Sequence, residues 1–332
     1  MVADGATSMS GDLVTMRDLR VLFRSADRTV HAVNGVDLTL AQGEVMGLLG
    51  ESGSGKSVTL RALLRLLPPK RSHITGKINV AGHDVMAMDE AATRDYRGSV
   101  VSMIFQEPML AFDPVFTVGE QIAEAVMRHE KVDKSAGMAR ALEMLDRVRI
   151  PSAKRRLEAY PHEMSGGMRQ RAMIALALAC KPKLLLADEP TTALDATVQI
   201  QILLLLRELQ REMGMGVIFV THDMGVAVEV SDKIAVMYAG RVIESGTVRD
   251  VIRSPSHPYT QGLLSSTVHG SMRGKRLEAI PGAPPNLATA PVDCAFSPRC
   301  KHVAPECKTG IPGLAPVSTG HLAACVRLGA SV

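Results

Sequence analysis

The stretch Gly50-Glu51-Ser52-Gly53-Ser54-Gly55-Lys56-Ser57 decides the fold, because it fits the pattern G-x-x-x-x-G-K-[ST]. The apolar run Val45 to Leu49 before it predicts a buried strand, and leucines at helical spacing follow it to Leu67. A loop between a strand and a helix N-terminus holds phosphate through inward backbone N–H groups and the helix dipole. We therefore expect residues 50–57 to bind a nucleotide, with Lys56 reaching the β- and γ-phosphates and Ser57 ligating Mg²⁺.

A second strand, Leu184-Leu185-Leu186-Ala187-Asp188-Glu189, ends in two carboxylates. A run this apolar predicts burial on both faces, as in a parallel sheet covered by helices. At the end of such a strand, Asp188 can hold Mg²⁺ through water. We expect Glu189 to polarise the water that attacks the γ-phosphate.

A second helix N-terminus rich in small residues, Ser165-Gly166-Gly167, precedes the apolar helix predicted over 171–179. It predicts a second phosphate-binding surface. Because the first loop already accounts for one nucleotide, this surface indicates that the chain completes the site of another subunit.

These three segments resemble the ATP-binding subunits of ATP-binding cassette (ABC) transporters. That family's usual Leu-Ser-Gly-Gly-Gln signature reads Met164-Ser165-Gly166-Gly167-Met168 here. The resemblance implies an α/β fold, the P-loop NTPase cassette, with a RecA-like core, an antiparallel β subdomain and a helical subdomain over about 107–165. It also implies ATP and Mg²⁺ as cofactors.

Further motifs of this family follow in order. The resemblance makes Gln106 the Q-loop residue that senses Mg²⁺ and the γ-phosphate, and Asp195, in Ala193-Leu194-Asp195, the D-loop residue at a dimer interface. His222 is the switch histidine, which would contact the γ-phosphate and hold Glu189. The family's adenine-stacking aromatic is missing near position 30, where Val30 or His31 stands; Phe23 is a third candidate. Met109, Leu110, Phe112 and Phe116 are candidates for the groove that receives the transporter's coupling helix, with plain helical core as the alternative for each of them.

The composition changes near residue 253. Residues 253–332 hold 8 basic and 3 acidic residues, a net charge of +5, and ten of the 18 prolines. We expect an ABC ATPase domain over 12–252 and a Cys/Pro-rich C-terminal extension over 253–332.

The extension carries the segments Ser256-His257-Pro258-Tyr259-Thr260 and Ser297-Pro298-Arg299-Cys300. These resemble the D-type ATPases of dipeptide and oligopeptide (and nickel) importers. The resemblance implies ATP-driven peptide import and a peripheral position on the cytoplasmic face of the inner membrane. The implied partners are a related F-type ATPase chain, two integral membrane permease subunits and an extracytoplasmic solute-binding protein.

Four of the five cysteines lie in the extension, at Cys294, Cys300, Cys307 and Cys325. A reducing cytosol disfavours disulfides, which leaves tetrahedral zinc, an iron–sulfur cluster or free thiols. The absence of C-x₂-C pairs and the resemblance to peptide importers favour a 4Fe-4S cluster. We expect ligation to stabilise a segment with few large apolar residues. His257, His302 and His321 are interpreted as surface residues, with metal ligation as the alternative, and Cys180 as a packing residue.

The composition excludes other classes of protein. No apolar stretch approaches the roughly 18 residues of a membrane span, and the N-terminus lacks the apolar core of a signal peptide. With 3% aromatic residues and no Trp, we expect no nucleic-acid partner. Two alternatives stay open. One is a soluble ABC ATPase of translation or DNA repair, and the other is a metal-dependent module in which the extension is the active part.

Overall fold

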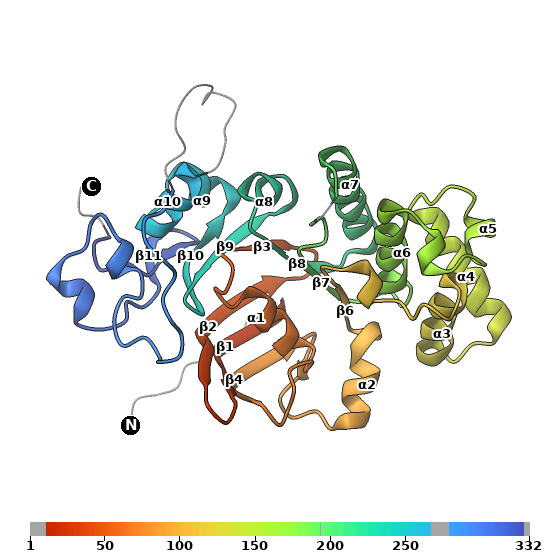
Figure 1. Cartoon of the computed structure of the whole chain (residues 1–332), viewed down its shortest axis with the longest axis horizontal. Helices are drawn as coiled ribbons and strands as arrows, with labels where there is room; N and C mark the ends of the chain where they lie inside the picture. The colour runs from red at the N-terminus through yellow and green to blue at the C-terminus, as the bar shows by residue number, and fades with distance from the viewer. Residues whose placement is uncertain (1–10, 193, 267–278, 329–332) are drawn as a thin grey trace.

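Two β-sheets organise the part of the chain that the computed structural model describes, residues 11–192, 194–266 and 279–328 (Figure 1). The larger is a mixed sheet in the order β11-β12-β10-β9-β3-β8-β7-β6. Its parallel centre consists of β3 (Val45–Leu49), β6 (Val101–Ile104), β7 (Leu184–Asp188), β8 (Gly216–Thr221) and β9 (Lys233–Tyr238). Strand β10 (Arg241–Thr247) pairs antiparallel with β9. The strands predicted around the phosphate loop and before Glu189 are confirmed.

The parallel strands are buried on both faces. Leu185 of β7 packs in one hydrophobic cluster, whereas Leu184 and Leu186 pack in another on the opposite side. This alternation follows from the two-residue period of a strand. Because both faces are covered, every position of β7 is apolar until the carboxylates at its end, as expected for a parallel sheet.

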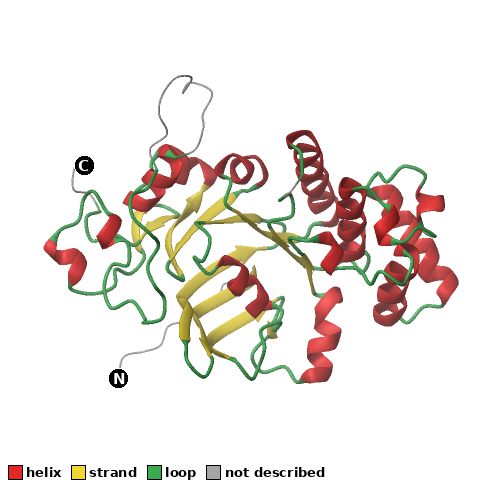
Figure 2. Cartoon of the chain, viewed as in Figure 1, coloured by secondary structure: helices red, strands yellow, loops and turns green. Residues whose placement is uncertain are grey.

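Different helices cover different parts of the large sheet (Figure 2). The first cluster contains residues of α6 (Gly166–Leu178) and α7 (Ala196–Met213), and the second contains residues of α1 (Lys56–Leu63). Two short helices, α8 (Met224–Val230) and α9 (Val248–Arg253), contribute to a third cluster around β9. Helix α1 ends at Leu63 rather than at Leu67, and α6 begins at Gly166, five residues before the predicted start.

The smaller sheet is antiparallel and packs over α1. It has the order β2-β1-β4-β5, from β1 (Asp12–Arg24), β2 (Thr29–Ala41), β4 (Ser72–Val80) and β5 (His83–Asp84). Its apolar residues join those of α1 in the second cluster. The predicted antiparallel β subdomain is therefore present.

A helical region lies between Gln106 and Ser165, at the right of Figure 1. It contains α3 (Val118–Glu130), α4 (Lys134–Arg147), α5 (Ala153–Arg156) and the 3-10 turns η1 (Pro108–Leu110) and η2 (Pro161–Glu163). It follows α2 (Glu90–Ser99) and β6. A capping box formed by Thr117 and Glu120 starts α3, so its first N–H groups are satisfied.

The C-terminal residues continue the large sheet at its edge. Strand β12 (His321–Ala323) pairs antiparallel with β10, and β11 (Ala315–Ser318) pairs with β12. Helix α10 (Pro258–Ser265) and the 3-10 turns η3 (Ser297–Arg299) and η4 (Pro305–Lys308) complete this part of the chain. Glu244 of β10 lies beneath it, fully buried, and accepts the N–H groups of Ser256 and His257.

Aromatic packing also holds these residues, which corrects the expectation of little core. Tyr259 is 0% exposed, and its ring centroid lies 4.6 Å from that of Tyr238 and 5.4 Å from that of Phe296. Burial of one large apolar side chain contributes about 1.5–3 kcal/mol, so these residues have a source of stability that does not depend on metal ligation. The surface interpretation of His257 and His321 is wrong, since both are buried.

None of the helices in the described part of the chain combines the length and the apolar character needed to cross a membrane.

Candidate nucleotide-binding and hydrolysis site

Residues 50–55 form the loop that joins β3 to α1. Gly50 has a φ of 147° and Gly55, at the N-cap of α1, a φ of 103°. A Cβ at Gly50 would clash with the carbonyl oxygen of Met237, so the loop needs glycine there for space as well as for backbone conformation. The N-terminus of α1 consequently opens onto the loop, as a phosphate site requires.

Lys56 is buried and folds back over its own loop. Its Nζ donates to the carbonyl oxygens of Gly50 at 2.8 Å and Glu51 at 3.0 Å. Burial lowers the pKa of Lys56, and the carboxylates of Glu189 and Asp188 oppose that shift. A partly desolvated ammonium with only neutral oxygens in contact is suited to receive an anion.

Ser57 and Asp188 meet across the start of α1 and the end of β7. Ser57 Oγ donates to Asp188 Oδ1 at 2.7 Å. Burial raises the pKa of Asp188, and the hydrogen bond from Ser57 lowers it in part. A hydroxyl and a carboxylate are hard oxygen donors of the type that Mg²⁺ prefers, so these residues fit the ion.

Three side chains contact the carboxylate of Glu189, and they follow the ends of the strands β6, β7 and β8. Its Oε2 accepts from Gln106 Nε2 at 3.2 Å and from Thr192 Oγ1 at 3.0 Å, and its Oε1 lies 3.2 Å from His222 Nδ1. The structure thus brings the three predicted catalytic residues together at the carboxyl edge of β6, β7 and β8. Thr192 was missed by the sequence analysis; a hydroxyl three residues after the glutamate was the available signal.

The Ser165-Gly166-Gly167 segment begins α6. Ser165 is the N-cap and accepts the N–H of Met168 at 3.3 Å. Ser165 and Gly166 are exposed, and a Cβ at Gly166 would meet no atom within 4 Å in the described residues. Met168, which replaces the usual glutamine, packs against the core instead. This helix N-terminus therefore faces outward.

Asp195 caps α7 in the same way, accepting the N–H of Val198 at 3.0 Å, and is exposed. Leu194 beside it packs against the core, and Ala193 lies outside the described residues.

The adenine candidates lie on β1 and β2. Val30 is the register partner of Phe23, and all three candidate side chains are half-buried. The backbone N–H of His31 donates to the carbonyl oxygen of Leu287 at 2.8 Å. The C-terminal residues therefore reach the candidate base-binding strand, a contact that the sequence analysis missed.

The candidate groove residues separate into two sets. Met109, Leu110 and Phe116 are exposed, by 43%, 77% and 52%. Phe112 is buried in the core of the helical region, so the alternative of a core residue holds for it in place of the groove.

The four cysteines of the extension line one cavity, together with His257 and His302. Burial raises the pKa of the Cys294, Cys300 and Cys325 thiols. Yet the described residues contain no group of three or more His, Cys, Asp or Glu side chains placed to hold a metal ion. The thiols converge, but a formed metal site is not part of this structure.

Two of the three histidines considered as ligands have other partners. His257 Nδ1 accepts the N–H of Tyr259, and His321 pairs with Glu244. Cys180, outside the extension, packs against the helical core, and burial raises its pKa to about 11.

The glycine-rich loop before α1, the carboxylates at the end of β7 and the histidine beside Glu189 are typical of nucleotide-hydrolysing proteins of the P-loop class. Residues 33–192 match the ABC transporter family, and residues 243–307 match the family described as oligopeptide/dipeptide transporter, C-terminal region. A putative peptide import ATP-binding protein of Brucella melitensis is 48% identical over 95% of this chain and 97% of its own length. The chain belongs to the ABC transporter family of ATP-binding proteins and is an ABC ATPase.

Two further relatives are similar over nearly their whole lengths. The oligopeptide transport ATP-binding protein OppD of Salmonella typhimurium is 47% identical, covering 95% of this chain and 93% of the relative. The dipeptide transport ATP-binding protein DppD of Bacillus subtilis is 45% identical, covering 94% of each.

Solved structures agree with the fold. A dimeric ATP-binding cassette in a post-hydrolysis state, bound to ADP and Pi, superposes with a TM-score of 0.64 at 28% identity. It covers 71% of this chain and 99% of its own. The ABC cassette fold is therefore confirmed for the greater part of the molecule.

Proposed function

We propose that this ABC ATPase powers the import of di- or oligopeptides through a membrane transporter. One observation carries the proposal: a cassette and a C-terminal region of the oligopeptide/dipeptide transporter type occur together in one chain. Relatives named for peptide import, oligopeptide transport and dipeptide transport align with it almost end to end.

In this proposal residues 50–57 bind the phosphates of ATP. Lys56 exchanges its backbone acceptors for phosphate oxygens, a stronger interaction because both partners are charged. Ser57 and Asp188 would hold Mg²⁺, directly and through water. When bound, Mg²⁺ neutralises the charge that develops on the β- and γ-phosphate oxygens during transfer.

Glu189 acts on the attacking water. Its carboxylate accepts the proton of the water or orients it, while His222, Gln106 and Thr192 keep the carboxylate turned toward the phosphate loop. Three contacts on one carboxylate restrict its rotation, which is how positioning contributes to the rate. Val30 and His31 would contact the adenine base of ATP.

Ser165, Gly166 and Gly167 complete the ATP site of a second cassette, with Asp195 at the same interface. The exposure of Ser165, Gly166 and Asp195 and the N-cap at Ser165 support this role, as does the dimeric solved cassette. The assembly proposed is a heterodimer with an F-type ATPase chain, two permease subunits and an extracytoplasmic solute-binding protein. The chain would lie peripherally on the cytoplasmic face of the inner membrane.

The proposed division of the chain is an ABC ATPase domain over 12–252 and an extension over 253–332. A 4Fe-4S cluster on Cys294, Cys300, Cys307 and Cys325 remains a proposal. The shared cavity supports it, and the thiol arrangement would have to tighten for ligation. Iron and acid-labile sulfide measured on anaerobically purified protein test it; zinc without sulfide would replace the cluster by a zinc site.

The test of the transport function is purification of the tagged chain from native membranes in mild detergent, followed by mass spectrometry. We expect two integral membrane proteins and a second cassette. Vesicles containing this complex should take up radiolabelled peptide only with ATP inside, and the Lys56→Ala complex should assemble without uptake. Ribosomal or DNA-repair proteins in place of membrane subunits would overturn the proposal.

A further inference from the structure

Glu51 is an acidic residue inside the phosphate loop. Its backbone lies between Gly50 and Ser52, and its carboxylate is close enough to Lys56 to act on the charge of that lysine, so it lies near the proposed site of a polyanion. Like charges at short range repel strongly wherever water is partly excluded. A loop that binds triphosphate therefore needs a cation to compensate Glu51, beyond the one that Lys56 supplies.

Arg299 of the extension provides that cation. Its Nη1 donates to Glu51 Oε2 at 2.7 Å and its Nη2 to Glu51 Oε1 at 3.0 Å, a bidentate ion pair. The two partners are 248 positions apart in the chain. Only 5% of the Arg299 side chain and 28% of the Glu51 side chain are exposed, so solvent screens this pair weakly.

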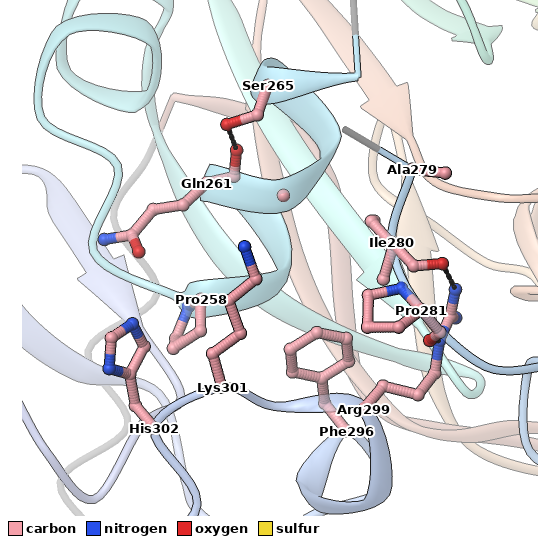
Figure 3. Close-up of a pocket in the computed structure, with 11 residues that line it drawn as sticks. Pro258, Gln261, Ser265, Ala279, Ile280, Pro281, Phe296, Arg299, Lys301 and His302 are labelled. Atoms are coloured by element: carbon pink, nitrogen blue, oxygen red, sulfur yellow. Dashed lines mark hydrogen bonds between the residues drawn. The ribbon is translucent and has the colours of Figure 1, made fainter. Parts of the chain in front are cut away.

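The rest of the guanidinium is fixed as well. Nε donates to the carbonyl oxygen of Pro281 at 2.8 Å, Nη2 to that of Ile280 at 3.4 Å, and Nη1 to Tyr238 Oη at 3.3 Å. Figure 3 shows Arg299 beside Ile280 and Pro281 at the edge of a pocket. Five interactions occupy an arginine with five N–H donors, so its orientation is determined.

A second contact from the extension holds the backbone of the same residue. The N–H of Glu51 donates to Tyr259 Oη at 2.9 Å, and Tyr259 is fully buried. The extension thus fixes both the carboxylate and the backbone N–H of Glu51.

We propose that Arg299 is a positioning residue of the ATP site: by pairing with Glu51 it neutralises that carboxylate and holds the phosphate loop in its binding shape. The C-terminal extension thereby sets the affinity for ATP. Arg299 acts through Glu51 and does not itself contact phosphate. The inference rests on ATP binding by the loop and is independent of the transported cargo.

The experiment compares Arg299→Gln, Glu51→Gln and the double variant in the full chain. Binding of a non-hydrolysable ATP analogue with Mg²⁺ is measured by calorimetry. We expect Arg299→Gln to weaken binding about tenfold, because an unpaired carboxylate then faces the phosphates. Glu51→Gln leaves the Arg299 cation unpaired beside the phosphates and should bind the analogue more tightly than the original chain, and the double variant should recover most of the loss. The deficit should shrink at about 1 M salt.

Two measurements separate positioning from a merely structural role. Unfolding midpoints without nucleotide are recorded for every variant, and Arg327→Gln, which removes an exposed charge from the same extension, is the matched control. The control should keep its ATP affinity. A purely structural Arg299 would lower the midpoint in the single and the double variant alike, without selective recovery of ATP affinity.

Unchanged ATP affinity in Arg299→Gln, or a double variant as weak as the single one, overturns the proposal. If Arg299→Gln does not fold, the ATP affinities of Arg299→Lys and Glu51→Gln test the proposal instead. Lysine keeps the charge and should lose less than about threefold in affinity, and a loss of about tenfold in Glu51→Gln would contradict compensation. Failure of the unmodified chain to bind ATP would instead count against the proposed function.

Discussion

Two histidine–glutamate pairs in this molecule have the same chemistry and different surroundings. At the nucleotide site, His222 Nδ1 lies 3.2 Å from Glu189, with side chains 63% and 20% exposed. Where the extension joins the large sheet, His321 Nε2 of the extension lies 2.8 Å from Glu244 of β10, with side chains 2% and 0% exposed. The two pairs therefore differ in solvent exposure, and this difference fits a ligand-binding role for the first pair and a structural role for the second.

The more exposed pair can exchange partners at little cost, because water replaces a hydrogen bond lost at an accessible group, and such a bond contributes about 0.5–1.5 kcal/mol. Glu189 can therefore leave His222 or Gln106 for a water molecule. The buried pair cannot, since removing one partner leaves buried hydrogen-bonding groups unsatisfied, at a cost of about 1–3 kcal/mol for each group. The polar side chains of the proposed ligand-binding site are accessible to solvent. The polar side chains that attach the extension to the large sheet are buried.

The largest expected effect breaks the exposed pair. Glu189→Gln should reduce the rate of ATP hydrolysis about 10²- to 10⁴-fold, because the amide cannot accept a proton from water. Phosphate release measures the rate. The stability against thermal unfolding should change by less than about 1 kcal/mol, since the glutamine oxygen can still accept the hydrogen bonds of Gln106 and Thr192. Hydrolysis within threefold of the original chain would remove Glu189 from the catalytic role.

Next in size is the buried pair. Glu244→Ala should lower the free energy of unfolding by about 3–5 kcal/mol, since His321 and the N–H groups of Ser256 and His257 lose their acceptor. Denaturant unfolding measures this change. Glu306→Ala, an exposed glutamate of the same extension, is the control and should cost less than about 0.5 kcal/mol. Equal losses in both variants would contradict the comparison.

A smaller effect comes from pH. Burial lowers the pKa of His257 to about 3, so folded His257 stays neutral while the unfolded chain takes up a proton below about pH 6.5. Its contribution is present above pH 6.5 and is lost as pH falls toward 3, by about 2 kcal/mol at pH 5.

Unfolding curves at pH 7 and pH 5 measure this dependence on the original chain and on His257→Asn. Asparagine keeps a side-chain acceptor for the N–H of Tyr259 and cannot titrate, so the variant should show a flatter pH profile. Identical profiles would place the pH dependence elsewhere.

The smallest effect on stability concerns Gly166. Alanine there meets no atom of the described residues within 4 Å and lies in the first turn of α6, so Gly166→Ala should raise stability by up to about 1 kcal/mol. Hydrolysis by the assembled pair of cassettes should nevertheless fall, because the methyl group occupies the surface proposed to face the partner's ATP. Full activity with increased stability would exclude that surface.

The sequence predicted the strands that carry the proposed nucleotide site, because their determinants are local. Val45–Leu49 forms the predicted strand, the loop follows it, and Asp188 and Glu189 end the next buried strand. Since carboxyl ends of neighbouring parallel strands share one edge, motifs far apart in the chain converge without further information. Gln106 and His222 reach Glu189 for this reason.

The extension was predicted less well. Its prolines and cysteines indicated a loop-rich segment, but its aromatic core around Tyr259 and the burial of His257 and His321 depend on the cassette surface beneath. A side chain's burial is decided by what packs over it, and no periodicity within 253–332 reports that surface. The sequence did not identify Thr192, because only the folded structure shows that its hydroxyl donates a hydrogen bond to Glu189.

By itself, then, the sequence determined the class of protein and the position of the phosphate-loop motif and of the carboxylate proposed to be catalytic, because each depends on a few consecutive residues with their own strand or helix. Only the tertiary structure decided that Arg299 pairs with Glu51 and that Tyr259 holds the backbone of the same residue. Glu51 and Arg299 lie 248 positions apart, and their pairing follows from docking of the extension on the edge of the large sheet. Which charged residues pair across a long stretch of sequence depends on how whole helices and strands pack together. Short sequence motifs do not carry that information.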